Sequence, residues 1–311
     1  MNPTALLQFF DARQARGEPL VLVTVYDTEG STYSKAGALM LVDENGVFRG
    51  MLSGGCLEGD LAVRAQHVLD SGRAQTVTYD LGDDDDELWG MGVGCDGLMR
   101  MLLLPLGPQD DYAPFNRIVA VWQGEQAEEL AIPFPGEDAD ELRIVVEPPP
   151  RILILGAGLD AEPVVRFAAE LGWRCDVFDH RPAYVDNGDF DAALLTTCAP
   201  AEELGGTLDL SRYAAAVVMS HHLVSDRTYL RQLADTDIGY IGLLGPAHRR
   251  NRLLSELGDA AELIEPRLHG PAGLDLGGRG PAPIALSIVA EIQQRLTETA
   301  ARAFSNSVNR P

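Results

Sequence analysis

The sequence predicts an α/β protein with two domains: an N-terminal mixed α/β domain followed by a Rossmann-like domain with a parallel sheet. The second half alternates short apolar runs with amphipathic stretches, which is the order of a parallel sheet covered by helices. A stiff, proline-rich break at residues 147–150 precedes this half. Because 311 residues are enough for two domains of ordinary size, we expect an N-terminal domain at 1–148 and a C-terminal domain at 149–311.

The N-terminal half predicts strands of one mixed sheet with helices beside them. Asp43-Glu44-Asn45-Gly46 separates two apolar runs, which is typical of a hairpin turn. The expected helices are 4–16 and 57–69, and the expected strands are 20–25, 38–42, 47–51, 76–79 and 98–104. Residues 105–150 contain short strand-like runs between prolines, glycines and acids.

The C-terminal half predicts the alternating order of a Rossmann-like fold. The expected strands are 151–155, 174–178, 192–196, 214–219 and 238–243. The expected helices are 160–171, 225–234, 246–257 and 283–304.

A dinucleotide-type fingerprint opens this second half. Gly156-Ala157-Gly158 follows an apolar strand and leads into a helix, so the backbone can approach a pyrophosphate beside the helix N-terminus. Asp179 ends the next strand, about 20 residues on, where a carboxylate accepts hydrogen bonds from ribose hydroxyls. Arg181 offers a phosphate contact instead. The pattern predicts ligand contacts at Gly156, Gly158 and Asp179, or a crevice that the fold retains without a dinucleotide.

Two adjacent histidines follow a later strand. Ser220-His221-His222 comes directly after the expected strand 214–219, so it lies at the carboxyl edge of the sheet, where ligands collect. His221 or His222 is a candidate polar contact to a ligand. The alternative is a structural histidine that caps the next helix.

Two glycine-rich loops of the N-terminal half each carry a cysteine. Ser53-Gly54-Gly55-Cys56 and Gly92-Val93-Gly94-Cys95 expose backbone N–H groups that can form an anion-binding concavity. Cys56 precedes a helix, where the helix dipole favours a thiolate. The alternative is that both cysteines are small buried apolar residues. Cys175 and Cys198 lie beside strands and are expected to be packing residues.

Composition excludes several classes of function. The formal net charge of −23 argues against broad contact with nucleic acid or anionic lipid, because both need compensating Lys and Arg. The four cysteines form no Cys-x-x-Cys pair, so a zinc knuckle is not expected. Neither a signal peptide nor a stretch of transmembrane length is evident. We expect a cytoplasmic protein with reduced thiols and no membrane partner.

Ordered motifs in both halves resemble one family, the xanthine dehydrogenase accessory factors (XdhC/CoxI). In the N-terminal half the matching motifs are Gly30-Ser31-Thr32, Gly37-Ala38, Ser53-Gly54-Gly55-Cys56-Leu57-Glu58 and Gly94-Cys95-Asp96-Gly97. In the C-terminal half they are Gly156-Ala157-Gly158, Phe178-Asp179-His180-Arg181-Pro182, Ser220-His221-His222, Tyr240-Ile241-Gly242-Leu243-Leu244-Gly245 and Gly273-Leu274-Asp275-Leu276-Gly277. The sequence departs from the family pattern at Leu159, where His is common, at Tyr33-Ser34-Lys35, and at Pro246-Ala247-His248.

The resemblance implies a cytoplasmic maturation factor for a molybdenum hydroxylase of the xanthine dehydrogenase type. Such proteins bind the molybdenum cofactor (molybdopterin) while its sulfido ligand is installed and deliver it to the apo-enzyme. The implied partners are that apo-enzyme, a cysteine desulfurase and a second copy of the chain. The implied cofactor-binding residues are Ser53, Gly54, Gly55, Cys56, Glu58, Gly94, Cys95, Gly156, Gly158, Asp179 and His221, with Cys56 and Cys95 at the metal. No catalytic residue is assigned.

A rival interpretation belongs to a different class. An NAD(P)-dependent oxidoreductase would use Gly156, Gly158 and Asp179 for its cofactor and His221 as an acid–base group. A clear catalytic set outside the fingerprint is not evident in the sequence. NAD(P) or another nucleotide therefore stays an alternative ligand of the C-terminal half.

Overall fold

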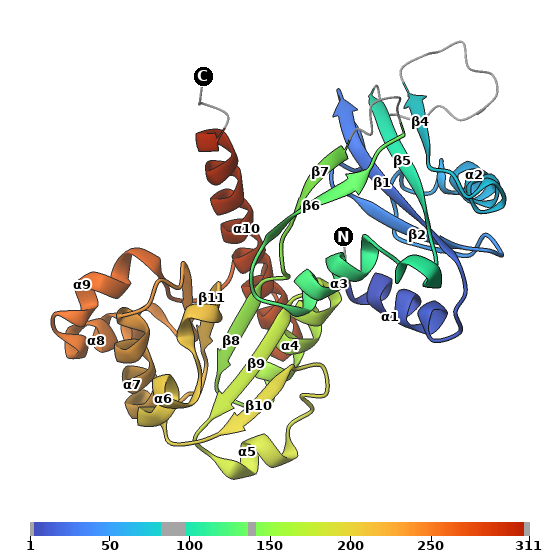
Figure 1. The fold of residues 1–311 in the computed structure, drawn as a ribbon. Coiled ribbons are helices and arrows are strands. Elements are labelled where there is room, and N and C mark those ends of the chain that lie inside the picture. Colours follow the sequence, from blue (N-terminus) through green and yellow to red (C-terminus); the bar gives the residue numbers. More distant parts are fainter. Residues whose placement is uncertain (1–2, 82–96, 136–140, 308–311) are drawn as a thin grey trace. The chain divides into compact units, whose positions relative to one another are not determined.

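The chain folds as two compact units in the computed structural model, Met1–Pro148 and Pro149–Pro311 (Figure 1). The structure describes residues 3–81, 97–135 and 141–307, with the side chains of 299–307 left out. In these ranges, none of the helices combines the length and the apolar character needed to span a bilayer.

An antiparallel sheet is the centre of unit 1. Among the described residues, five strands pair in the order β3-β2-β1-β5-β4, and each of these pairings is antiparallel. The sequence led us to expect a mixed sheet, and that expectation is wrong for the described strands. The elements of the unit are α1 (Pro3–Gln14), β1 (Leu20–Glu29), β2 (Leu39–Asp43), β3 (Phe48–Arg49), α2 (Glu58–Ser71), β4 (Gln75–Asp80), β5 (Leu98–Leu106), η1 (Pro108–Asp110), α3 (Phe115–Gln123), β6 (Glu128–Pro133) and β7 (Glu141–Val146).

Both faces of this sheet are covered. Along β1, Leu20 and Leu22 pack on one side with α1 and α3, while Val21 and Val23 pack on the other side with α2. Helix α3 lies where the sequence predicts strand-like runs. Its signal is Pro114 followed by apolar residues at helical spacing, and its buried face completes the first core.

Unit 2 is a Rossmann-like domain. Within its described part, six strands form a parallel sheet in the order β10-β9-β8-β11-β12-β13, which is the order 3-2-1-4-5-6 of a dinucleotide-binding fold. Its strands are β8 (Arg151–Leu155), β9 (Arg174–Asp179), β10 (Leu195–Cys198), β11 (Ala215–Val218), β12 (Tyr240–Leu243) and β13 (Leu268–His269). Its helices are α4 (Ala161–Glu170), α5 (Pro182–Asn187), η2 (Ala201–Glu203), α6 (Leu204–Thr207), η3 (Leu210–Arg212), α7 (Leu223–Ala234), α8 (Ala247–Leu257), α9 (Ala260–Ile264), η4 (Glu265–Arg267) and α10 (Pro281–Ser307).

The helices of unit 2 cover opposite faces of the sheet. Ile152 and Ile154 of β8 pack with α4 and α10, while Leu153 and Leu155 pack with α6 to α9. After β8 the chain turns into α4 on one face, and after the neighbouring β11 it turns into α7 on the other (Figure 1). The carboxyl ends of β8 and β11 therefore form the switch point of the sheet, which is where ligands bind in such folds.

Candidate functional site

Glu58 determines the shape of the loop that precedes α2. Its carboxylate accepts hydrogen bonds from the backbone N–H groups of Leu52, Ser53 and Gly55, at 2.7, 2.8 and 3.0 Å. The Ser53 hydroxyl donates to the same carboxylate at 2.5 Å and accepts from the Leu57 N–H at 2.7 Å. Glu58 is 2% exposed. An internal carboxylate thus fills the N–H concavity that the sequence suggested for a ligand anion.

Hydrogen bonding keeps this buried carboxylate ionised. Burial acts to raise the pKa of Glu58, but the hydrogen bonds from the Ser53 hydroxyl and from the N–H groups of Ser53 and Leu52 outweigh burial. The net effect lowers the pKa below its ordinary value. Ser53 and Glu58, named above as cofactor contacts, therefore have a role inside the loop.

The two glycines of the loop face outward. Gly54 and Gly55 are exposed and have φ angles of +78° and +111°, which favour glycine. A Cβ atom on Gly55 would meet no atom within 4 Å, so the space in front of it is open. Cys56 is half-buried and packs partly against the core beside α2. The loop, hereafter the Cys56 loop (residues 52–57), presents a thiol beside bare backbone.

Other family motifs come together at the same edge of the sheet. Because the strands are antiparallel, β1 ends and β5 begins at this edge. A Cβ atom on Gly97 would lie 2.4 Å from the Ser31 carbonyl oxygen, so the two backbones are in direct contact. The Tyr33 ring lies 3.3 Å from where a Cβ atom on Gly54 would be. Gly94 and Cys95 lie outside the described residues.

The two other cysteines differ from each other. Cys175 is buried on β9, and burial raises the pKa of its thiol to about 12, as expected for a packing residue. Cys198 is exposed at the end of β10. The expectation that Cys198 is a packing residue is therefore wrong, because the edge strand leaves its last residue uncovered.

In unit 2 the glycine turn fits closely against the neighbouring strand end. A Cβ atom on Gly156 would lie 2.6 Å from the Met219–Ser220 peptide, and φ of Gly156 is +129°. Met219 donates its N–H to the Leu155 carbonyl at 2.8 Å. Only glycine fits here, and the contact brings the Gly156 turn (residues 156–160) beside Ser220-His221-His222.

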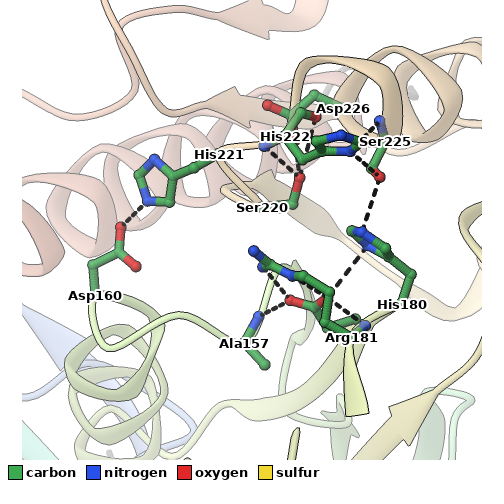
Figure 2. Close-up of polar contacts among 10 residues, drawn as sticks. Ala157, Asp160, His180, Arg181, Ser220, His221, His222, Ser225 and Asp226 are labelled. Carbon is green, nitrogen blue, oxygen red and sulfur yellow. Dashed lines mark hydrogen bonds and ion pairs between the residues drawn. The ribbon is translucent and has the colours of Figure 1, made fainter. Parts of the chain in front are cut away.

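Asp179 is buried against this turn instead of facing open space. Its carboxylate accepts from the Ala157 N–H at 2.7 Å, and from the Arg181 N–H and Nε at 2.9 Å and Nη2 at 2.6 Å (Figure 2). Asp179 is 0% exposed. Burial acts to raise the pKa of Asp179, but the Arg181 side chain and the two N–H groups lower it overall. Both oxygens are thus engaged by the protein itself.

His221 and Asp160 join two loops across the switch point. The His221 Nε2 and Asp160 Oδ2 atoms are 2.7 Å apart (Figure 2). Asp160 stands at the N-cap of α4, and a Cβ atom on Gly158 would lie 2.6 Å from its Oδ1. The hydrogen bond with Asp160 raises the pKa of His221, although burial opposes it. The His221 side chain is 59% exposed, so it stays accessible to a ligand.

His222 and Ser220 have structural contacts. The His222 Nδ1 accepts from the Ser225 N–H at 3.4 Å, which caps α7 as the alternative interpretation held. Ser220 donates to Asp226 at 2.5 Å, and Arg249 Nη2 binds the other oxygen of Asp226 at 2.6 Å. This buried set fixes the loop that carries His221.

The geometry indicates what the switch point can do. The N-terminus of α4 and a protonated His221 favour an anion at the Gly156 turn, whereas the Asp160 carboxylate opposes it. An anion that binds His221 must therefore compete with Asp160. Among the described residues, no group of three or more His, Cys, Asp or Glu side chains is arranged to hold a metal ion.

Sequence reasoning missed Asp160 and the internal roles of Glu58 and Asp179. The first loop had no readable signal, because Ser53 and Glu58 are five residues apart whereas a capping box needs a spacing of three. The Asp160–His221 contact joins residues 61 positions apart. A sequence without a structure contains no signal for it.

Comparison with known proteins gives consistent matches over most of the chain. A family model described as the XdhC Rossmann domain matches residues 152–292, and one described as the XdhC and CoxI family matches residues 13–80. A Bacillus subtilis (strain 168) protein, named as a probable xanthine dehydrogenase subunit, is 33% identical over 91% of this chain and 95% of that protein. The Escherichia coli (strain K12) protein PaoD, named a molybdenum cofactor insertion chaperone, is 26% identical over 92% of this chain and 86% of that protein.

A solved structure matches as well. A crystal structure described as a xanthine dehydrogenase from Bacillus halodurans superposes with a TM-score of 0.77 and 30% identity, covering 94% of this chain and 95% of that one. The predicted α/β fold with a Rossmann-like second half is therefore confirmed.

We expect Glu58→Gln to lower the free energy of unfolding by about 1–3 kcal/mol at neutral pH. The NH₂ group of the new amide would face buried backbone N–H groups, so donors would meet donors. Urea denaturation followed by circular dichroism measures this. Since the folded pKa is depressed, the stabilisation is present above the unfolded value of 4.5 and is lost as pH falls through the folded pKa. The matched control Asp70→Asn, on the exposed face of α2, should change stability little. Equal stability of wild type and Glu58→Gln would contradict the assigned role.

We expect the pKa of His221 to lie above its ordinary value of 6.5 and to fall in Asp160→Asn, because the partner carboxylate is lost. NMR titration of the imidazole measures both values, with His221→Gln used for assignment. The pair stabilises the fold fully below the unfolded pKa, and this stabilisation is lost as pH rises through the folded pKa. Glu162→Gln, also in the first turn of α4 but bonded to the Asp189 N–H, is the control. An unchanged titration in Asp160→Asn would refute the contact.

Proposed function

We propose, from the premise that the chain belongs to the XdhC and CoxI family, that it is a maturation factor for a molybdenum hydroxylase of the xanthine dehydrogenase type. The protein binds the molybdenum cofactor as its cargo, holds it during sulfuration, and delivers it to the apo-enzyme. The observation that carries the proposal is the relationship over 92% of the chain to a protein named a molybdenum cofactor insertion chaperone. The cargo, not the protein, supplies the metal and its chemistry.

The Cys56 loop fits one end of such a cargo. A half-buried thiol, two exposed glycines and open space in front of Gly55 allow a sulfur-bearing group to approach the backbone closely. We assign to Cys56, together with Cys95, the contact with the sulfur ligands of the metal. Ser53 and Glu58 hold the loop, and Gly54, Gly55 and Gly94 supply backbone to the cargo. A cargo that arrives with its own metal ligands does not need a multi-ligand protein metal site.

The Gly156 turn fits a phosphate-bearing ligand. Gly156 and Gly158 keep side chains away from the turn, and α4 directs its N-terminus there. His221 would exchange its contact with Asp160 for the ligand phosphate. Asp179 orients the turn through the Ala157 N–H and does not bind the ligand directly.

The remaining parts of the proposal concern partners and place. Delivery needs a surface for the apo-enzyme, and sulfuration needs a cysteine desulfurase as the sulfur source. We propose that both meet this protein in the cytoplasm and that it acts as a homodimer. The free thiols of Cys56, Cys175 and Cys198 are consistent with a reducing compartment.

The rival function is an NAD(P)-dependent oxidoreductase. The 3-2-1-4-5-6 strand order and the glycine turn favour it. The saturated carboxylate of Asp179 weighs against it, because a ribose hydroxyl would have to displace Arg181 or the Ala157 N–H. The maturation role therefore has the stronger support.

We expect Cys56→Ala and Cys95→Ala to retain the fold and to reduce activation of an apo molybdenum hydroxylase by about 10-fold or more, the scale of losing a contact at a metal site. The assay reconstitutes the client with cofactor carried by the purified protein. Cys198→Ala removes an exposed thiol from a strand end of unit 2 and is the matched control. If both loop variants activate the client as well as wild type, the loops contribute shape and not sulfur.

We expect no steady reduction of NAD(P) by the protein with a panel of small alcohols, aldehydes and hydroxy acids, because the described residues show no clear catalytic set beyond the His221–Asp160 pair. Absorbance of the reduced nicotinamide measures this. Sustained turnover with one specific substrate, lost in Gly158→Val, would overturn the maturation role in favour of the rival.

A further inference from the structure

The chain contains one lysine. Of its 24 basic Lys and Arg residues, only Lys35 is a lysine, and the other 23 are arginines. Wherever a general surface cation is needed, this sequence uses arginine. Lysine differs from arginine in having a compact ammonium group that acts as a point charge with three donors. The single lysine therefore indicates that position 35 needs an ammonium group and not a guanidinium.

Lys35 lines an open hollow in unit 1. The start of α1 (Ala5 and Leu6), the loop 33–38 and the pair Gly50-Met51 enclose an open groove of about 800 Å³, hereafter the Lys35 groove. This volume lies in the range of small-molecule sites. Tyr33 and Met51 form part of its wall and are 60% and 55% exposed, so both present apolar surface to a ligand.

The ammonium group is positioned by its own loop. Lys35 Nζ donates to the Gly30 carbonyl at 3.3 Å and to the Thr32 hydroxyl at 3.2 Å. Among the described residues these two acceptors hold it and neither is a carboxylate, so the positive charge is not neutralised there. Within those residues its third donor has no partner and is available to a ligand. In a chain with a net charge of −23, this is a local exception that favours an anion.

The neighbouring groups select for a flat ring. The Tyr33 hydroxyl donates to the Met51 sulfur at 3.4 Å, which holds an aromatic face and a polarisable thioether side by side. Ser34 donates to the Met51 carbonyl at 3.3 Å and fixes the two segments together. Aromatic and thioether surfaces stack on planar heteroaromatic rings with little preference for ring identity.

We propose that the Lys35 groove is a binding site for a small ligand in which a planar heteroaromatic ring carries a phosphate group. Tyr33 and Met51 contact the ring, and Lys35 binds the phosphate. This site is separate from the Gly156 turn, which belongs to the other unit, and it goes beyond the proposed function. The Tyr33 ring also lies against Gly54, so a ligand in the groove adjoins the Cys56 loop.

The test uses guanosine 5′-monophosphate, a fused ring with a phosphate, against guanosine and inorganic phosphate separately. Calorimetry should give saturable binding of the nucleotide to the full chain, with each fragment at least about 10-fold weaker because one contact set is lost. Lys35→Met keeps the aliphatic stem and should weaken nucleotide binding about 10-fold. Tyr33→Leu should weaken binding of the nucleotide but not of inorganic phosphate. Arg73→Met removes one exposed cation beyond the end of α2 and should leave binding unchanged.

The single lysine also provides a direct probe. Reductive methylation with ¹³C-formaldehyde labels one side chain and the chain's amino terminus, so Lys35 has its own NMR signal. That signal should shift with the same saturation curve as the calorimetry.

Three outcomes overturn the proposal: absence of saturable nucleotide binding, wild-type affinity in Lys35→Met, or a Lys35 signal that stays fixed while the nucleotide binds. The last would assign the binding to the Gly156 turn. None of these experiments uses molybdenum cofactor or a client enzyme. A negative result here therefore does not contradict the maturation role, and failed client activation does not contradict ligand binding in the Lys35 groove.

Discussion

A buried carboxylate holds a glycine-rich loop in each unit, and the shape of both candidate sites depends on it. Glu58 gathers three backbone N–H groups ahead of α2, and Asp179 ties the Gly156 turn to Arg181. Glycine loses more conformational freedom on ordering than other residues, so such loops do not fix themselves. Charged hydrogen bonds in a dry environment are strong enough to do so. Cys56 and His221 therefore stand on backbone that is ordered before any ligand arrives.

The parts of the fold that local patterns determine could be predicted from the sequence. The alternation in unit 2 follows from apolar runs and glycine turns, and β8, α4 and β9 lie within a residue of their expected ends. Pairing direction in unit 1 could not be predicted, because strand pattern does not say which strands become neighbours. The site divides in the same way: the chain positions of Cys56 and His221 were readable, whereas the contact of His221 with Asp160 depends on the switch point bringing β8 and β11 together.

Two kinds of chemistry are assigned to two units. Unit 1 offers a thiol loop at the edge of an antiparallel sheet, and unit 2 offers a phosphate-type turn at the edge of a parallel sheet. Glycine shapes each of them differently: Gly55 leaves open space beside the backbone, whereas Gly156 lets the turn pack directly against the Met219–Ser220 peptide. A sulfur-ligated metal suits the thiol loop of unit 1, and a phosphate suits the turn of unit 2. A dinucleotide alone would leave the thiol loop without a purpose.

The carboxylate-held loops have a kinetic consequence for the proposed role as a carrier. A site that folds around its ligand loses affinity to the cost of ordering, and the ligand leaves only when the site opens again. A site whose walls are rigid beforehand needs no such opening. Affinity then rests on a few direct contacts, each of which a receiving enzyme can replace one at a time. Glu58, which need never touch the cargo, would in this way govern how readily it changes hands.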